Sequence, residues 1–169
     1  MEQFDVIVIG TGVAGQTAAG ELAAAGKRVA VADKREFGGT CALRGCEPKK
    51  VLYTAAEVAE RAAAQAGNGL SGTVDVDWPS LIAFKRTFTD SVPPAIEKSL
   101  TDSGAVALHG LARFVSEDTI DVGGTQYAAE HFVIATGAVP RDLGIPGAEL
   151  VTDNEGFMAA ETLGGRVAF

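Results

Sequence analysis

The sequence FDVIVIGTGVAG occupies residues 4–15 and decides the fold class of the chain. Its first half, residues 4–9, is apolar at every position except Asp5 and rich in β-branched side chains, as expected of a buried strand. Three glycines follow, at Gly10, Gly12 and Gly15. A helical pattern then continues to Gly26, which is suited to cap a helix C-terminus. Strand, tight turn and helix in this order predict the first unit of an α/β domain with a parallel sheet.

An acidic residue stands at the distance that a dinucleotide-binding fold requires. A second predicted strand, residues 28–32, ends on Asp33, 23 positions after Gly10. In such a fold the three glycines allow the turn, the close approach of a pyrophosphate and the packing of helix on strand. The helix N-terminus then holds the phosphates. The backbone expected to meet them comprises Gly12, Val13, Ala14 and Gly15.

The residues at the end of the second strand also indicate which nucleotide binds. The carboxylate of Asp33 is expected to accept the two hydroxyls of an adenosine ribose. Lys34 follows directly and belongs to the predicted cofactor site. The positive charges of Lys34 and Arg35 are compatible with a 2′-phosphate on the ribose, as in NADP. The carboxylate of Asp33 beside them would repel such a phosphate. FAD, whose ribose carries no such phosphate, therefore fits better than NADP.

Both cysteines of the chain lie in residues 37–52, FGGTCALRGCEPKKVL. Four residues separate Cys41 from Cys46, and a lysine pair and a helical pattern follow. The positive end of a helix and nearby lysines favour thiolate over thiol. Structural disulfides are rare in a reducing compartment, and a thioredoxin-like motif would have two intervening residues. We therefore expect a reactive pair.

Together with the glycine loop, this stretch resembles the active-site segment of the class I pyridine nucleotide-disulfide oxidoreductases, which include glutathione reductase, dihydrolipoamide dehydrogenase and mercuric reductase. The family pattern is Gly-Gly-Thr-Cys, four residues, Cys, any residue, Pro, Ser or Lys, and Lys, and residues 38–50 fit it throughout. Only Glu47 is unusual, since an apolar residue is common there. The Pro-Lys-Lys form is closest to the glutathione reductase branch, and the resemblance covers essentially the whole chain.

The resemblance implies a route for electrons. They would pass from a nicotinamide to FAD, then to a Cys41–Cys46 disulfide, and on to an acceptor disulfide of a small molecule or a protein. By position, Cys41 is the interchange thiol that attacks the acceptor, and Cys46 is the thiol beside the flavin. Lys49 or Lys50 is expected to stabilise negative charge near the flavin. Thr40 is expected to contact the nucleotide on its flavin side.

The rest of the chain is predicted to form helices followed by strands. Helices are expected at residues 48–66 and 77–100, the second broken at its two adjacent prolines. Strands are expected at residues 105–108, 111–116, 119–122, 125–128 and 131–135. The predicted fold is α/β, a Rossmann-like parallel sheet with flanking helices and a three-stranded β-meander inserted before the last parallel strand.

Further nucleotide contacts follow from the resemblance. Gly110 and Ala112 match a family segment whose backbone meets the adenine. Thr136 and Gly137 match a turn that closes over the nucleotide. Gly39, in the Gly-Gly-Thr turn, completes the expected FAD site.

The composition excludes several classes of partner. A net charge of −8 argues against nucleic acid, because phosphate binding needs a basic surface. The apolar run near the start is too short to span a bilayer and has no targeting signal, so we expect no membrane partner and a cytoplasmic location. His109 and His131 stand alone and far from the cysteines, so no metal site is predicted.

We predict that residues 1–150 are an FAD-binding domain carrying the cysteine pair. Residues 151–169 would lead into the first strand of an NAD(P)-binding domain. In the family, NAD(P)H is the co-substrate, and a His-Glu pair lies in an interface domain of what we expect to be a homodimer. Neither a nicotinamide-binding site nor this His-Glu pair is found in this sequence. The 169-residue chain by itself is therefore expected to be inactive and to bind FAD weakly or not at all.

Other functions stay open beside the glutathione reductase type. Within the family, the alternatives are the lipoamide dehydrogenase and mercuric reductase types. Outside it, the chain is a nucleotide-binding module without turnover, or a single-domain NAD(P) protein. Thermal protection by NADPH, with none from FAD, would favour the last of these.

Overall fold

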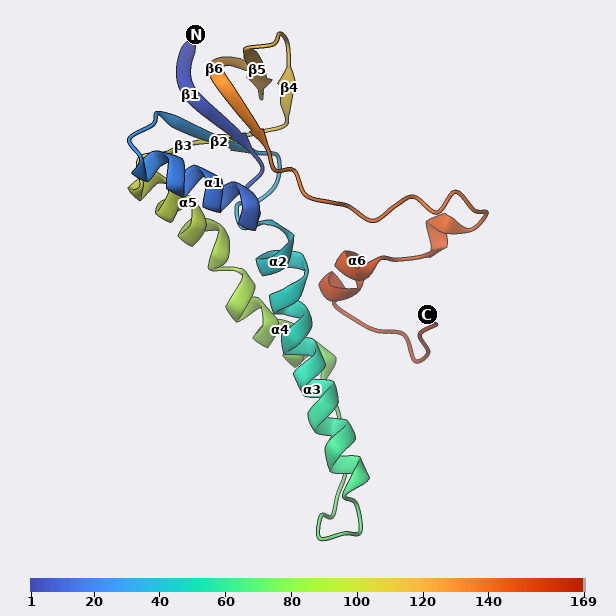
Figure 1. The fold of residues 1–169 in the computed structure, drawn as a ribbon. Helices are drawn as coiled ribbons and strands as arrows, with labels where there is room; N and C mark the ends of the chain where they lie inside the picture. Colours follow the sequence, from blue (N-terminus) through green and yellow to red (C-terminus); the bar gives the residue numbers. More distant parts are fainter. Residues whose placement is uncertain (169) are drawn as a thin grey trace. The chain divides into compact units, whose positions relative to one another are not determined.

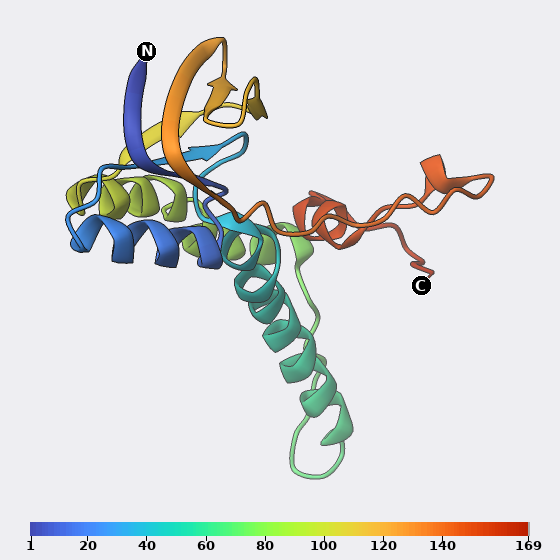
Figure 2. The same cartoon turned by 45° about the horizontal axis from the view of Figure 1, so that its top comes forward.

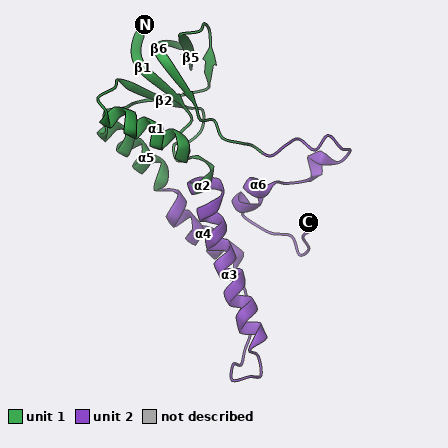
Figure 3. Ribbon diagram, viewed as in Figure 1, with its two compact units in different colours: residues 1–41, 91–139 green, residues 42–90, 140–169 purple. Residues whose placement is uncertain are grey.

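The computed structural model describes residues 1–168, and the chain forms two compact units (Figure 3). Unit 1 consists of residues 1–41 and 91–139, and unit 2 of residues 42–90 and 140–169. The chain first passes from one unit to the other directly after Cys41, inside the predicted redox stretch.

Unit 1 contains a six-stranded sheet in the order β3-β2-β1-β6-β5-β4 (Figure 1). The strands are β1 (Glu2–Ile9), β2 (Val29–Asp33), β3 (Val106–His109), β4 (Ala112–Phe114), β5 (Thr119–Val122) and β6 (Thr125–Ile134). The neighbouring pairs β3–β2, β2–β1 and β1–β6 are parallel, whereas the pairs β6–β5 and β5–β4 are antiparallel. The predicted α/β class with a mostly parallel sheet is confirmed.

Two helices cover one face of this sheet, α1 (Val13–Ala24) and α5 (Val92–Asp102). Ala19 of α1 and Leu100 of α5 are buried against valines of β1 and β2. The small residues of α1 allow this helix to approach the strands closely. Gly26, at φ +80°, donates its N–H to the carbonyl of Ala23 and ends the helix as predicted.

The meander lies over the face of the sheet opposite to α1 and α5 (Figure 2), and here the structure corrects the prediction. Ile120 and Val122 of β5 pack on Ile7 and on alanines of β2. The third meander strand and the last parallel strand, predicted at residues 125–128 and 131–135, form the single strand β6. Because β1 begins at Glu2, its edge pairs with β6 from Tyr127 onward. An uninterrupted strand satisfies more backbone groups than two strands with a loop between them.

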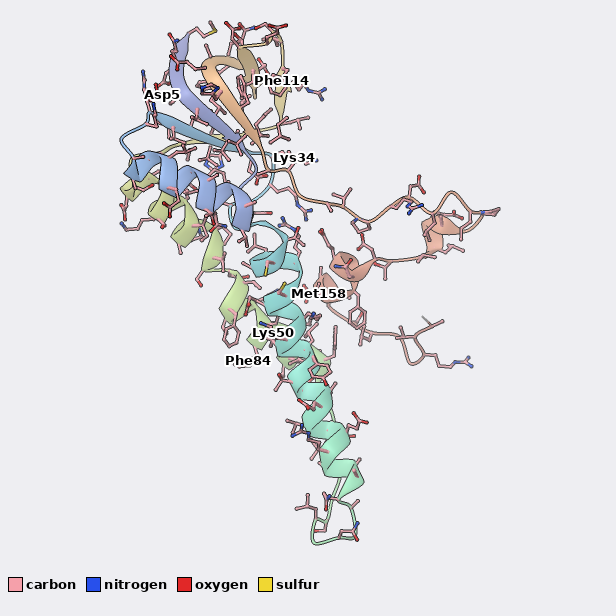
Figure 4. The ribbon with its side chains drawn as sticks, in the orientation of Figure 1. Asp5, Lys34, Lys50, Phe84, Phe114 and Met158 are labelled. Atoms are coloured by element: carbon pink, nitrogen blue, oxygen red, sulfur yellow. The ribbon has the colours of Figure 1, made fainter. Side chains whose placement is uncertain are left out.

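Unit 2 is helical. It contains α3 (Cys46–Ala64), α4 (Trp78–Thr89), the 3₁₀ turn η1 (Ala148–Leu150) and α6 (Asn154–Ala159). A short helix, α2 (Gly39–Arg44), precedes α3. The core of unit 2 is small, with Leu52, Ile82 and Met158 buried together (Figure 4 labels Met158). Across residues 1–168, no helix is long and apolar enough to cross a lipid bilayer.

The predicted break within the second long helix, at its two adjacent prolines, is confirmed. α4 ends at Thr89 and α5 begins at Val92. Pro93 and Pro94 lie in the first turn of α5, where a missing N–H leaves no helical hydrogen bond unmade. The prolines therefore start a new helix.

The C-terminal stretch contains a helix that the sequence analysis missed. Asp153 caps α6 by accepting a hydrogen bond from the N–H of Gly156 at 2.8 Å. The structure assigns no strand to residues 165–168, which have no second sheet to join within residues 1–168, and Phe169 lies outside the described residues. The assignment of residues 151–169 to the start of another domain stays a prediction.

Candidate functional site

The residues predicted to bind a nucleotide gather at the carboxyl ends of the parallel strands of unit 1. Gly110, after β3, donates its N–H to the carbonyl of Asp33 at 2.8 Å. Ala135, after β6, donates to the carbonyl of Ile9 at 2.8 Å, and Thr136 follows it. The ends of β1, β2, β3 and β6 therefore meet at one edge. This edge is where open α/β sheets bind ligands.

Glycine is required at two positions of the loop after β1. Gly10 has φ +110°, and a Cβ there would lie 2.2 Å from the carbonyl oxygen of Ala135. A Cβ on Gly15 would lie 1.9 Å from the carbonyl oxygen of Gly10. At Gly12, by contrast, the nearest atom would be the Cα of Gly39 at 3.9 Å. The loop is tightly packed against its own strands, yet leaves room at the position predicted to meet a pyrophosphate.

The N-terminus of α1 adds donors to this space. Gly12 is its N-cap residue in extended conformation, and it has no side chain with which to cap the helix. Val13 and Ala14, in the first turn, are exposed. Their N–H groups point along the helix axis at its positive end, an arrangement that suits a phosphate. These residues fit the dinucleotide that the sequence predicted.

Asp33 is held by the glycine loop. Its Oδ2 accepts the N–H of Thr11 at 2.8 Å and the Oγ1 hydroxyl of Thr11 at 2.6 Å. Its Oδ1 accepts the N–H of Arg35 at 3.0 Å. A carboxylate offers about four acceptor positions, so a ribose hydroxyl still finds one. No pattern in the sequence predicts that Thr11 orients Asp33.

The start of the cysteine stretch packs against the glycine loop, within unit 1. Gly39 has φ +71°, and a Cβ there would lie 2.3 Å from the Cα of Gly12. The N–H of Gly38 donates to Thr11 Oγ1 at 3.4 Å. Thr40 is exposed, and Cys41 is half-buried in α2. The chain thus carries Cys41 two residues past a backbone contact with the nucleotide loop.

Cys46 lies in unit 2, at the first position of α3 and after the N-cap Gly45. It is an exposed free thiol beside a groove of about 500 Å³. The groove is lined by Gly45, Cys46, Lys49, Leu52, Tyr53 and Ala56 on one side and by Asn154, Phe157 and Met158 of α6 on the other. Most of these side chains are apolar.

The structure separates the two candidate lysines. Lys49 lines the groove that contains Cys46. Lys50 pairs with Glu47 at 3.5 Å and lines a different groove, between α3 and α4 (Figure 4 labels Lys50). Of the two lysines, only Lys49 lines the groove that contains Cys46.

For three predicted cofactor residues, the structure shows no hydrogen bond or close approach that bears on nucleotide binding. Lys34 is exposed directly after β2 (Figure 4). Ala112 begins β4, and Gly137 has φ +71° after β6. Their roles stay predictions.

The two histidines lie far from the cysteines in sequence, and neither of them lines the groove of Cys46. His109 is paired with Glu97 at 3.0 Å and stacks on Phe37, with ring centroids 4.7 Å apart. His131 is exposed on β6. Among residues 1–168, no group of three or more His, Cys, Asp or Glu side chains is placed to hold a metal ion.

A comparison with known proteins decides the family. A family model described as pyridine nucleotide-disulphide oxidoreductase matches residues 4–164. The chain belongs to this family. Pyridine nucleotide-disulphide oxidoreductases bind FAD and use NAD(P)H, in agreement with the cofactor prediction.

Curated members of the pyridine nucleotide-disulphide oxidoreductases match nearly the whole chain. A dihydrolipoyl dehydrogenase of Thermus scotoductus is 35% identical over 95% of this chain and 35% of its own length. A glutathione reductase of Burkholderia cepacia is 33% identical over 90% of this chain and 34% of its own length. The chain therefore spans about a third of the length of these relatives.

Two charged residues in unit 2 could not be recognised as buried from the sequence. Arg44 is largely buried, and its Nε lies 3.7 Å from Glu155 of α6. Lys85 is also buried, and it donates to the carbonyl of Met158 at 2.9 Å. Burial lowers the pKa of Lys85, and Arg86 lowers it further, while Asp90 and Glu161 oppose the shift. Neither contact was predictable without α6.

Proposed function

We propose that residues 1–169 act as the FAD-binding part of an NAD(P)H-dependent flavin disulfide oxidoreductase, with Cys41 and Cys46 as its redox pair. The observation that carries this proposal is the contact between Gly39 and Gly12. It joins the cysteine stretch to the loop that is shaped for a pyrophosphate. A cysteine next to a nucleotide loop is what electron transfer between flavin and thiol needs.

The residues that would hold FAD come from unit 1. The first-turn N–H groups of α1 would bind the pyrophosphate, and Asp33, oriented by Thr11, would accept a ribose hydroxyl. The N–H of Gly110 donates to the backbone carbonyl of Asp33 and so holds Gly110 beside the ribose-binding residue. The backbone at Gly110 would therefore meet the adenine. FAD, when bound, would relay two electrons from NAD(P)H, and these would return the cysteine pair to its dithiol form.

The cysteine pair reduces the acceptor by thiol–disulfide exchange. Cys41, as thiolate, attacks one sulfur of the acceptor disulfide, forms a mixed disulfide and releases the first thiol. Cys46 then attacks the sulfur of Cys41, closes the Cys41–Cys46 disulfide and releases the second thiol. The acceptor gains two electrons and two protons, and the protein loses the same.

Lys49 is the lysine that we assign to this site. Lys49 lines the groove that contains Cys46, whereas Lys50 lines a different groove. Lys50 is engaged by Glu47. We therefore expect Lys49→Met to slow thiol–disulfide exchange more than Lys50→Met does.

For the acceptor we propose a glutathione disulfide-type substrate, because the Pro-Lys-Lys sequence after Cys46 is closest to the glutathione reductase branch. A relative of each type matches at similar identity, so the acceptor is a matter for assay. Turnover with glutathione disulfide but not lipoamide supports this proposal. Turnover with lipoamide alone assigns the lipoamide dehydrogenase type instead.

Replacement of Cys41 tests the assigned roles in an oxidoreductase that contains these residues. Cys41→Ser removes the attacking thiol, so reduction of the acceptor disulfide should fall by at least about a thousandfold. Reduction of the flavin by NAD(P)H, followed by absorbance in the stopped flow, should be unchanged. Loss of both activities contradicts the separate role of Cys41. Loss of neither favours a nucleotide-binding module whose cysteines do no redox work.

A further inference from the structure

The carboxyl end of α6 is held by side chains of α4, entirely within unit 2. The indole N–H of Trp78 donates to the carbonyl of Ala160 at 2.9 Å. The ammonium group of Lys85 donates to the carbonyl of Met158, also at 2.9 Å. The last carbonyls of a helix have no partner within that helix. α4 therefore supplies two of the donors that the end of α6 lacks.

Burying the ammonium group of Lys85 against the end of α6 costs free energy. Only 7% of its surface is exposed, and a buried ammonium group needs partners to offset its lost hydration. The charged groups that act on it are Arg86, Asp90 and Glu161. A cation at the carboxyl end of a helix also interacts favourably with the helix dipole. A buried lysine that holds a six-residue helix is unusual enough to need a reason.

That reason is found on the other side of α6. Phe157 and Met158 form a wall of the groove in which Cys46 lies. Phe157 also packs on Trp78, with ring centroids 5.5 Å apart, and Met158 is buried with Leu52 of α3. α6 is thus fixed by α4 on one side and faces the reactive thiol on the other. Any movement of α6 changes the shape of the groove.

We propose that Lys85 is a positioning residue: by holding α6 against α4, it shapes an apolar groove that accepts a ring-sized apolar group beside Cys46. Lys85 does not itself line the groove. The proposal deepens the proposed function, and it rests on that function only in taking Cys46 as a reacting thiol. It implies that thiol reagents carrying an apolar ring react faster at Cys46 than their small analogues do.

The test compares two thiol reagents on the folded 169-residue chain, N-phenylmaleimide and N-methylmaleimide. Each adds the thiolate across its double bond, and peptide masses give separate rates for Cys46 and Cys41. The thiolate fraction enters both rates equally, so their ratio reports the groove rather than thiol acidity. Lys85→Met should lower the ratio at Cys46 by about threefold, as the loss of partial ring burial predicts. The ratio at Cys41 should not change.

Three further variants complete the design. Lys85→Arg keeps a cation and should preserve most of the wild-type ratio. Lys98→Met removes an exposed lysine that pairs with Asp102 and should have no effect. Trp78→Phe keeps the ring but loses the N–H that bonds Ala160, so it should lower the ratio in the same direction. This variant decides the matter if Lys85→Met does not fold.

Distinct results overturn the proposal. A folded Lys85→Met variant with the wild-type ratio at Cys46 contradicts it, and so does an equal fall at both cysteines, which would indicate a general loss of structure. If Lys85→Met does not fold, a wild-type ratio in Trp78→Phe contradicts it. A selective fall at Cys46 in a protein whose cysteines perform no disulfide exchange would uphold the groove and refute the proposed function.

Discussion

Gly15 and Gly20 both lie in α1, yet only one of them has to be glycine. A Cβ on Gly15 would meet the backbone of Gly10 at 1.9 Å, while a Cβ on Gly20 would meet nothing within 4 Å. The sequence predicted the role of Gly15 from its spacing alone. It gave no means to predict the partner of Asp33, because the bond from Thr11 depends on how the loop folds back over β2.

The two glycines make a matched pair of variants. Gly15→Ala forces the loop away from the helix and should lower the free energy of unfolding by about 3 kcal/mol. Gly20→Ala should raise it by about 0.5 to 1 kcal/mol, since alanine loses less backbone freedom in a helix. Urea unfolding followed by circular dichroism measures both. Equal effects of the two substitutions would show that the loop is not packed as described.

Among the elements, β6 and α6 differ most from what the sequence predicted. The pattern of residues 125–135 suggested two strands, because short-range alternation does not show that β1 extends far enough to pair with all of them. α6 is only six residues long, so it has too few turns for a helical period to be recognised. The longer elements, whose periodicity is strong, were predicted to within a few residues.

The short α6 depends on its cap. Asp153→Ala removes the carboxylate that accepts the N–H of Gly156, which should cost about 1 kcal/mol and speed amide hydrogen exchange of residues 154–159 about fivefold. Asp142 makes a similar bond to Gly144 outside any helix, so Asp142→Ala is the control and should leave that exchange unchanged. Mass-resolved hydrogen exchange gives the rates. No difference between the variants would mean that α6 does not need this cap.

Across the whole molecule, the two units divide the expected chemistry between them. Unit 1 carries the nucleotide loop, Asp33 and Cys41, and unit 2 carries Cys46, Lys49 and the groove beside them. The motifs predicted the family and the candidate residues of both units. They could not predict Arg44 and Lys85, because both depend on contacts with a distant segment of the chain. Fold class follows from local pattern, and the packing around the thiols does not.

The redox titration of the cysteine pair tests the central claim most directly. The chain is equilibrated in dithiothreitol or glutathione buffers of known potential, and its mass reports the loss of two hydrogens. We predict an intramolecular Cys41–Cys46 disulfide with a midpoint between about −200 and −300 mV, and none in Cys46→Ser. A chain that forms no internal disulfide in the most oxidising buffer, or only disulfide-linked dimers, would contradict the account.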